Sequence, residues 1–215
     1  MPEVLSIDVW SDVVCPFCYL GSRQLTEALK RFEHRDEVIV RQRAFELDPS
    51  TPASSTMPLD ELVAKKYGIP VERSRELHHR LEEQARSYDM TWSFATAKRA
   101  NSFDAHRLIA LASTQDFGET MSQRLFAAYF SDGLLINDHD VLNEFAAQVG
   151  VVGAPALWTS DAYVSVVRSD EEEALELGIT GVPAMLMDRK FMVLGAQGVA
   201  KIENVLARAW ERQGV

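Results

Sequence analysis

Cysteine is scarce in this sequence: the 215 residues contain two, separated by three positions. Two cysteines cannot build a disulfide framework, and a bridge between such close neighbours closes too short a loop to stabilise a fold. The chain also lacks any run approaching the roughly 20 apolar residues that cross a bilayer, and no short motif recurs at a fixed period. These absences argue against a disulfide scaffold, a membrane-spanning protein and a solenoid.

Basic residues are outnumbered as well: 22 Lys and Arg stand against 32 Asp and Glu, for a formal net charge of −10. This charge repels phosphate backbones and anionic lipid surfaces, so we expect neither a nucleic-acid nor a membrane partner. The first ten residues include Glu3, Ser6 and Asp8 and lack the basic start and unbroken apolar stretch of a secretory signal, which predicts a cytoplasmic protein. The hydrophobic content of 47% and the charged content of 25% are those of an ordinary folded protein.

The beginning of the chain predicts a β-α-β unit. Residues 4–10 are rich in Val, Leu and Ile, which indicates a buried strand. Residues 16–33 predict an amphipathic helix, because Pro16 suits a first turn and apolar side chains then recur at i, i+3, i+4 and i+7. Residues 38–45 predict a second strand.

The end of the chain supplies the remaining strands. Residues 182–187 and 191–194 predict a hairpin, and a helix with an apolar stripe follows. The middle of the chain shows helical spacing, with five or six helices and no convincing strand. The order β-α-β and then β-β-α is that of a thioredoxin fold. We therefore predict an α/β protein in which residues 1–56 and 179–215 form a thioredoxin-like domain and residues 57–178 form a large all-helical insertion.

Both cysteines lie in the motif Cys15-Pro16-Phe17-Cys18, directly after the first predicted strand and at the start of the first predicted helix. Dithiol exchange needs one sulfur that is a thiolate and open to a partner, and a second thiol placed to displace that partner. A helix N-terminus favours negative charge, which makes Cys15 the attacking sulfur and Cys18, one turn inside, the resolving one. Phe17 adds an apolar wall for a substrate and no positive charge.

Two other interpretations of the motif stay open: a zinc site and inert buried thiols. Cys-x-x-Cys is half of a zinc tetrahedron, but the chain has no further cysteine and its five histidines include no pair with ligand spacing, so no metal site is predicted. Buried cysteines without chemistry are the simpler alternative. The strand-to-helix context favours redox chemistry over both.

Four segments of the chain carry a resemblance to a known family. They are Ser-Asp-Val-Val-Cys-Pro-Phe-Cys-Tyr-Leu-Gly at 11–21, Phe-Glu-Leu-Asp-Pro at 45–49, Asn-Ser-Phe-Asp-Ala-His-Arg-Leu at 101–108 and Gly-Val-Pro at 181–183. Over its whole length the chain resembles the DsbA family, and within it the FrnE-like group, which is related to 2-hydroxychromene-2-carboxylate isomerases and kappa-class glutathione transferases. These isomerases and transferases typically carry serine at the position of Cys15, so the dithiol points away from their chemistry.

The resemblance implies that the helical insertion lies over the dithiol and that Pro183 is a cis proline facing Cys15. The backbone of Val182 would then hydrogen-bond an extended substrate. Without the resemblance, Pro183 would simply begin a strand. The resemblance also implies that Asn101 and His106 lie near the substrate cleft, where a peptide or glutathione would touch them; capping or packing is the alternative for both.

Acidic and aromatic residues before the motif are candidates for supporting roles. Asp8 would be costly to bury as a charge, so it is predicted either to relay protons for Cys18 or to point to water. Side chains alternate along a strand, so Trp10 lies on the same face as Asp8 and is predicted to belong to the cleft wall or to the core. Asp12, three residues before Cys15, is expected to cap the helix or to disfavour the thiolate.

We therefore predict a thiol–disulfide oxidoreductase that acts on protein or low-molecular-weight disulfides, with no tightly bound cofactor and with glutathione as a candidate co-substrate. A glutathione-dependent isomerase or transferase that uses the same cleft is the second hypothesis, and a chaperone-like binding module is the third. The sequence leaves open the natural substrate, the direction of electron flow and the oligomeric state.

Overall fold

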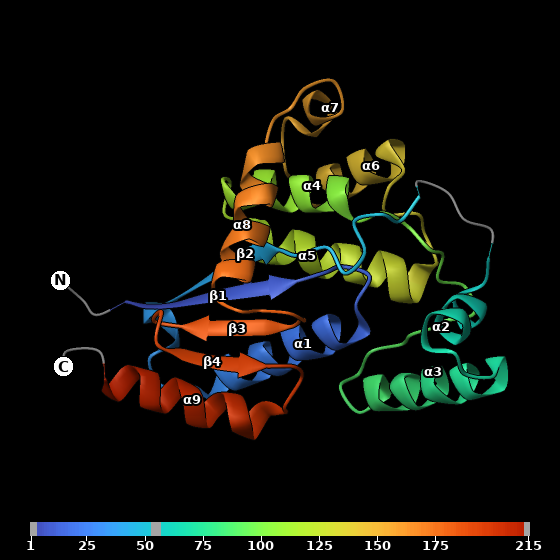
Figure 1. Cartoon of the computed structure of the whole chain (residues 1–215). Helices are drawn as coiled ribbons and strands as arrows, with labels where there is room; N and C mark the ends of the chain where they lie inside the picture. Colours follow the sequence, from blue (N-terminus) through green and yellow to red (C-terminus); the bar gives the residue numbers. More distant parts are fainter. Residues whose placement is uncertain (1–3, 53–56, 213–215) are drawn as a thin grey trace.

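A four-stranded mixed sheet organises the computed structural model, which describes residues 4–52 and 57–212 (Figure 1). Its strands are β1 (Leu5–Ser11), β2 (Val38–Ala44), β3 (Ala184–Met187) and β4 (Phe191–Leu194). They lie in the order β2-β1-β3-β4, with β1 and β2 parallel and the other neighbours antiparallel. This is the thioredoxin arrangement that the sequence predicts. The third strand begins later than predicted because Pro183 has no N–H to donate to the ladder.

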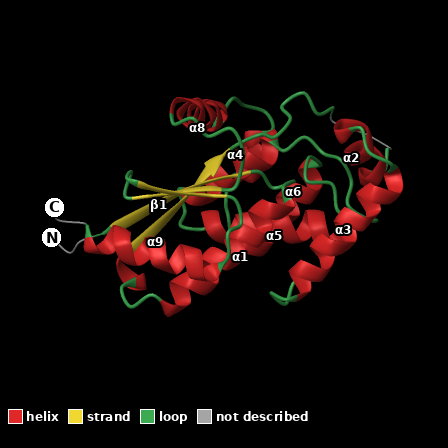
Figure 2. Cartoon of the chain, turned by 60° about the horizontal axis from the view of Figure 1, so that its bottom comes forward, coloured by secondary structure: helices red, strands yellow, loops and turns green. Residues whose placement is uncertain are grey.

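Helices cover the sheet on both faces. The helices α1 (Pro16–Arg31) and α9 (Val199–Glu211) lie on one face, and α8 (Val164–Glu176) lies on the other (Figure 2). Because side chains alternate along a strand, β1 directs Leu5, Ile7 and Val9 to the first face and Trp10 to the second. The helix α8 belongs to the predicted insertion by position in the chain, yet it forms one layer of the thioredoxin unit.

The remaining helices lie above and to the right of the sheet in Figure 1. They are α2 (Leu59–Tyr67), α3 (Val71–Arg86), α4 (Phe103–Ser113), α5 (Gly118–Ala127), the π-helix η2 (Ala128–Asp132), α6 (His139–Val149) and α7 (Ala154–Leu157); a 3-10 turn, η1 (Arg35–Glu37), precedes β2. With α8, the described part of segment 57–178 holds seven α-helices, one above the predicted range, because the single turn of α7 is too short to show a helical period. Across the described residues, no helix has the length and apolar character needed to cross a membrane.

An aromatic cluster holds the first turn of α1 against these helices. The ring of Tyr19 stacks on Phe126 of α5 with centroids 5.0 Å apart and on Trp92 with centroids 5.4 Å apart. Phe130 of η2 lies 5.2 Å from the Trp92 ring. Each such aromatic pair contributes about 0.5–1.5 kcal/mol beyond the burial of its apolar surface. The start of α1 is therefore fixed between the sheet and the helical segment.

Candidate active site

The N-terminus of α1 places both cysteines. Cys15 is the N-cap residue, in extended backbone with φ −93° and ψ 116°, and Pro16 is the first helical residue. The Cys18 N–H donates to the Cys15 carbonyl at 3.0 Å and closes the first turn. Among the described residues no side chain caps this helix, and its first turn holds no acidic residue. The positive end of the helix dipole therefore acts on the Cys15 sulfur.

Cys15 lies deeper than the sequence predicts. Both thiols are free, with 4% of Cys15 and 1% of Cys18 exposed. The Cys15 thiol donates to the Val182 carbonyl at 3.7 Å, so the segment before β3 covers the sulfur. The peptide bond between Val182 and Pro183 is cis, as the family resemblance implies. The expectation of an exposed sulfur is wrong for this arrangement, since Cys15 is 4% exposed and its sulfur contacts the Val182 carbonyl.

Cys18 is held as a neutral thiol. Burial raises the pKa of Cys18 well above its ordinary value, and a hydrogen bond with Cys15 and electrostatic interactions with Cys15 and Asp12 raise it further. The Asp12 N–H donates to Cys18 Sγ at 3.5 Å, which lowers the pKa without offsetting the burial. Cys18 therefore keeps its proton at neutral pH.

Asp12 is buried beside Cys18, and it does not cap α1 with its side chain. Its carboxylate accepts the Leu47 N–H at 2.7 Å and the Val14 N–H at 3.3 Å. The Nε2 atom of His106, on α4, lies 3.6 Å from Asp12 Oδ1. Sequence reasoning missed this contact, because the two residues lie far apart in the chain. The one feature of the sequence that points to this contact is that both residues belong to segments that carry the family resemblance.

Glu46 and Tyr129 extend this buried polar region, and neither was singled out from the sequence. Glu46 pairs with Arg168 of α8 at 2.7 Å, and burial raises the pKa of the Glu46 carboxyl. Burial and the charge of Asp12 raise the pKa of Tyr129, which lies in η2. Such π-helical turns occur frequently at functional sites. Within the described ranges, no cluster of three or more His, Cys, Asp or Glu side chains is placed to hold a metal ion.

Asp8 lies on the face of the sheet opposite α1, which does not suit a proton relay to Cys18. It is fully buried, so it does not point to water either. Its Oδ1 accepts from Arg43 Nε at 2.9 Å, and Arg43 Nη1 also donates to Asp170 of α8 at 2.9 Å. The Asp8 charge is therefore compensated by Arg43 on the α8 face. The relay assignment to Asp8 is not supported by this geometry.

Trp10 and Asn101 have structural contacts where substrate contacts were predicted. Trp10 is fully buried and its Nε1–H donates to the Asp170 carbonyl at 2.8 Å, so it belongs to the core and not to a cleft wall. Asn101 accepts the Phe103 N–H at 2.9 Å and donates to the Thr51 carbonyl at 3.3 Å, which joins the start of α4 to the loop after β2. Contact of Asn101 or His106 with substrate stays a prediction.

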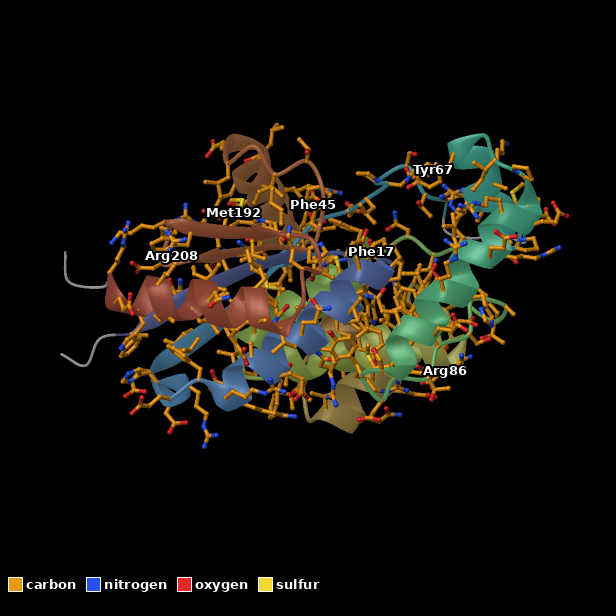
Figure 3. The ribbon with its side chains drawn as sticks, turned by 90° about the horizontal axis from the view of Figure 1, so that it is seen from below. Phe17, Phe45, Tyr67, Arg86, Met192 and Arg208 are labelled. Atoms are coloured by element: carbon orange, nitrogen blue, oxygen red, sulfur yellow. The ribbon has the colours of Figure 1, made fainter. Side chains whose placement is uncertain are left out.

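Phe17 is the exposed member of the dithiol motif, with 47% of its surface accessible. In Figure 3 it lies at the start of α1, between the strands and the α2–α3 pair on which Tyr67 is labelled. Leu47, whose N–H binds Asp12, is also exposed. An exposed apolar side chain thus belongs to the dithiol motif, and another belongs to the residue that binds Asp12.

Sequence and fold both place the chain in a known family. Residues 6–207 match the family described as DSBA-like thioredoxin domain. The chain belongs to this family. A solved structure of a probable DsbA oxidoreductase from Streptomyces coelicolor is 32% identical, with a TM-score of 0.93 over 98% of this chain and 92% of that chain. The uncharacterized protein YwbO of Bacillus subtilis (strain 168) is 28% identical over 217 residues, 94% of this chain and 95% of YwbO.

Two more distant structures share the fold of this DsbA-family protein. A 2-hydroxychromene-2-carboxylate isomerase is 18% identical, with a TM-score of 0.72 over 96% of this chain and 97% of its own. The cytosolic disulfide reductase DsbM from Pseudomonas aeruginosa is 17% identical, with a TM-score of 0.61 over 96% of this chain and 98% of its own. Proteins of this fold thus include both disulfide oxidoreductases and isomerases.

Gly21 sets how closely α1 of this DsbA-family protein approaches the Val182–Pro183 segment. A Cβ at position 21 would lie 2.9 Å from Pro183 Cγ, a ring atom tied to the backbone. Gly21→Ala is therefore expected to destabilise the fold by about 1–3 kcal/mol, although alanine is ordinarily the better helix residue. Urea unfolding measures the change, with Gly181→Ala as control because a Cβ there meets nothing within 4 Å. An unchanged or higher stability of Gly21→Ala would show that the Val182–Pro183 segment can shift to accommodate the methyl group at little cost.

Proposed function

We propose that this DsbA-family protein is a thiol–disulfide oxidoreductase in which Cys15 attacks and Cys18 resolves. The observation that supports this is the unequal setting of two free thiols in one helical turn. Cys15 is at the positively polarised N-terminus of α1, whereas burial keeps Cys18 protonated. This division favours attack by the first sulfur and prevents the second from competing with it.

In the reducing direction, the Cys15 thiolate attacks one sulfur of a substrate disulfide, and the first substrate thiolate leaves and takes up a proton. Cys18 then loses its proton and attacks the Cys15 sulfur, which releases the second substrate thiolate. Two electrons and two protons pass to the substrate, and Cys15 and Cys18 end as a disulfide that an external thiol reduces. The reverse sequence oxidises a substrate dithiol.

We propose protein and low-molecular-weight disulfides as substrates, bound along the Val182 backbone by strand addition and against Phe17. Glutathione is the proposed co-substrate, because it supplies the external thiol that the reducing cycle needs. The structure of Pseudomonas aeruginosa DsbM with GSH supports this by shared fold, at 18% identity. The cytosolic description of DsbM likewise supports a cytoplasmic location for this chain.

Redox titration of the intact protein tests the proposed function. After equilibration in glutathione buffers of graded ratio, the protein is expected to interconvert between two forms that differ by the mass of two hydrogen atoms. Alkylation should label both thiols in one form and neither in the other. The apparent potential decides the direction in which the protein acts. A chain that keeps both thiols free in every buffer, or that only adds glutathione without losing it, would refute a dithiol cycle.

Glutathione-dependent isomerisation is the competing proposal, and the fold shared with 2-hydroxychromene-2-carboxylate isomerase supports it. In that reaction glutathione supplies the nucleophilic thiol, so Cys18 is dispensable. Turnover of a small aromatic substrate that requires glutathione and survives Cys18→Ser would favour it over disulfide exchange.

A further inference from the structure

The proposed function raises a question of proton transfer at Cys18. The Cys18 thiol is 1% exposed, and it must become a thiolate to attack the Cys15 sulfur. Solvent does not reach this position directly, and a bound substrate would cover the dithiol further. A base positioned inside the protein accelerates such a step by about 10²–10⁴-fold. The buried groups beside Cys18 are therefore candidates for the acceptor.

Asp12 is the carboxylate next to Cys18. Its backbone N–H binds Cys18 Sγ, and the charge of its carboxylate acts on the same sulfur. The side chain is buried, and within the described ranges its one ion-pair partner is His106. Hydrogen bonds from Leu47 and Val14 hold the carboxylate in place without neutralising it with a formal charge. The Asp12 carboxylate thus offers the Cys18 thiol a base that is held in place inside the protein.

His106 is the imidazole next to the Asp12 carboxylate. It is 3% exposed, and its Nε2 atom has no hydrogen-bond partner among the described residues, although Asp12 Oδ1 is 3.6 Å away. The Glu46 carboxylate also interacts with His106, and Arg168 of α8 pairs with Glu46 and with Glu171. Burial and the charge of Asp12 both raise the pKa of Tyr129 in η2, so its hydroxyl stays neutral. The charges of two carboxylates, Asp12 and Glu46, thus act on the His106 imidazole.

We propose that Asp12 and His106 together accept the proton of Cys18 during resolution. As the S–H bond of Cys18 breaks, its electron pair forms the bond to Cys15 Sγ, and the bond between Cys15 and the substrate sulfur breaks with its electrons on the departing thiolate. The proton passes to the Asp12 carboxylate and is shared with His106. From this pair the proton passes to solvent, where the departing substrate thiolate takes up a proton, and Cys18 regains a proton when an external thiol reduces the disulfide.

A groove of about 740 Å³ along β2 gives this pair a route to solvent. His106 lines the groove together with Ala44 and residues of α8, whereas Cys15, Phe17 and Val182 do not line it. The groove therefore lies apart from the residues that are proposed to bind substrate. A proton on His106 can leave by this route while a substrate covers the dithiol.

Transient kinetics of Asp12→Asn and His106→Gln in the full chain test the proposal. Formation of the mixed disulfide reports attack by Cys15, and release of the second substrate thiol reports resolution by Cys18. Both variants are expected to slow resolution by about 100-fold at neutral pH, the size of effect that a general base provides, and to change attack far less. Resolution should then accelerate with rising pH in the variants, because hydroxide replaces the lost acceptor.

His78 offers a matched control, because it is a largely buried histidine that pairs with Asp60, away from the contacts of the dithiol. His78→Gln is expected to leave resolution and its pH profile unchanged. Should Asp12→Asn fail to fold, His106→Gln alone decides the question. Unchanged resolution in the variants, or equal slowing of attack and resolution with the wild-type pH profile, would overturn the proposal. Absence of any mixed disulfide in the wild-type chain would instead refute the proposed function.

Discussion

Serine in place of Cys15 is expected to lower disulfide-exchange turnover by about three orders of magnitude or more, because a nucleophile and the group that resolves its intermediate act as a unit. Serine in place of Cys18 is expected to leave the first attack intact and to stop the cycle at the mixed disulfide. The measurements are the initial rate of reduction of a model disulfide and intact-mass detection of the covalent adduct.

The two variants serve as controls for each other, since each keeps one thiol in the same helical turn. Only the Cys18→Ser variant should carry a substrate adduct, and the doubly substituted chain should carry none. An adduct on the Cys15→Ser variant would exchange the roles of the two sulfurs. Wild-type turnover in both single variants would place the chemistry elsewhere in the chain.

Alanine in place of Arg43 is expected to destabilise the fold by about 3 kcal/mol, the effect of removing one partner from a buried ion pair. Arg43 bridges Asp8 and Asp170, whose side chains are 1% and 8% exposed. Without it, two carboxylates remain buried in one site. The half-exposed Arg189, 4.0 Å from Asp8, is too distant and too solvated to replace it. Urea unfolding should show a lower midpoint at an unchanged slope.

Arg41→Ala is the control for this prediction, because Arg41 is exposed on the same strand and its loss is expected to change stability by less than about 0.5 kcal/mol. The loss of stability in Arg43→Lys should fall between those of Arg43→Ala and Arg41→Ala, since an ammonium group cannot bind both carboxylates as the planar guanidinium does. The disulfide-exchange rate of folded Arg43→Ala is expected to match that of the wild type, because the ion pairs of Arg43 lie on the α8 face of the sheet. A loss of less than about 1 kcal/mol would show that the carboxylates relax or protonate at little cost.

The fold was largely predictable because its signals are local. Apolar runs mark the strands, a glycine in left-handed backbone ends α2 at Gly68, and Pro16 begins α1. Alternation correctly placed Asp8 and Trp10 on one face of β1. Alternation along β1 does not predict which helix covers that face, because α8 lies at the far end of the helical segment in the sequence. The relay assignment to Asp8 failed for this reason.

The site was predictable only where one stretch of chain builds it. The position of Cys15 and Cys18 at a helix start follows from their own spacing and from Pro16. The cover over Cys15 comes from Val182, and the neighbour of Asp12 comes from α4. Contacts between residues so distant in the chain depend on the three-dimensional arrangement of helices, which periodicity does not encode.

The hydrogen bond between Cys15 and the Val182 carbonyl also bears on chemical damage. Exposed thiolates react with peroxides and pass irreversibly to sulfinic and sulfonic acids. Here the nucleophile is sheltered by the backbone group that an extended partner would occupy. A peptide, glutathione included, offers amide groups in exchange for that contact, and a peroxide offers none. We therefore expect Cys15 to overoxidise more slowly than an exposed thiolate, through the same contact that suits the proposed peptide-like substrate.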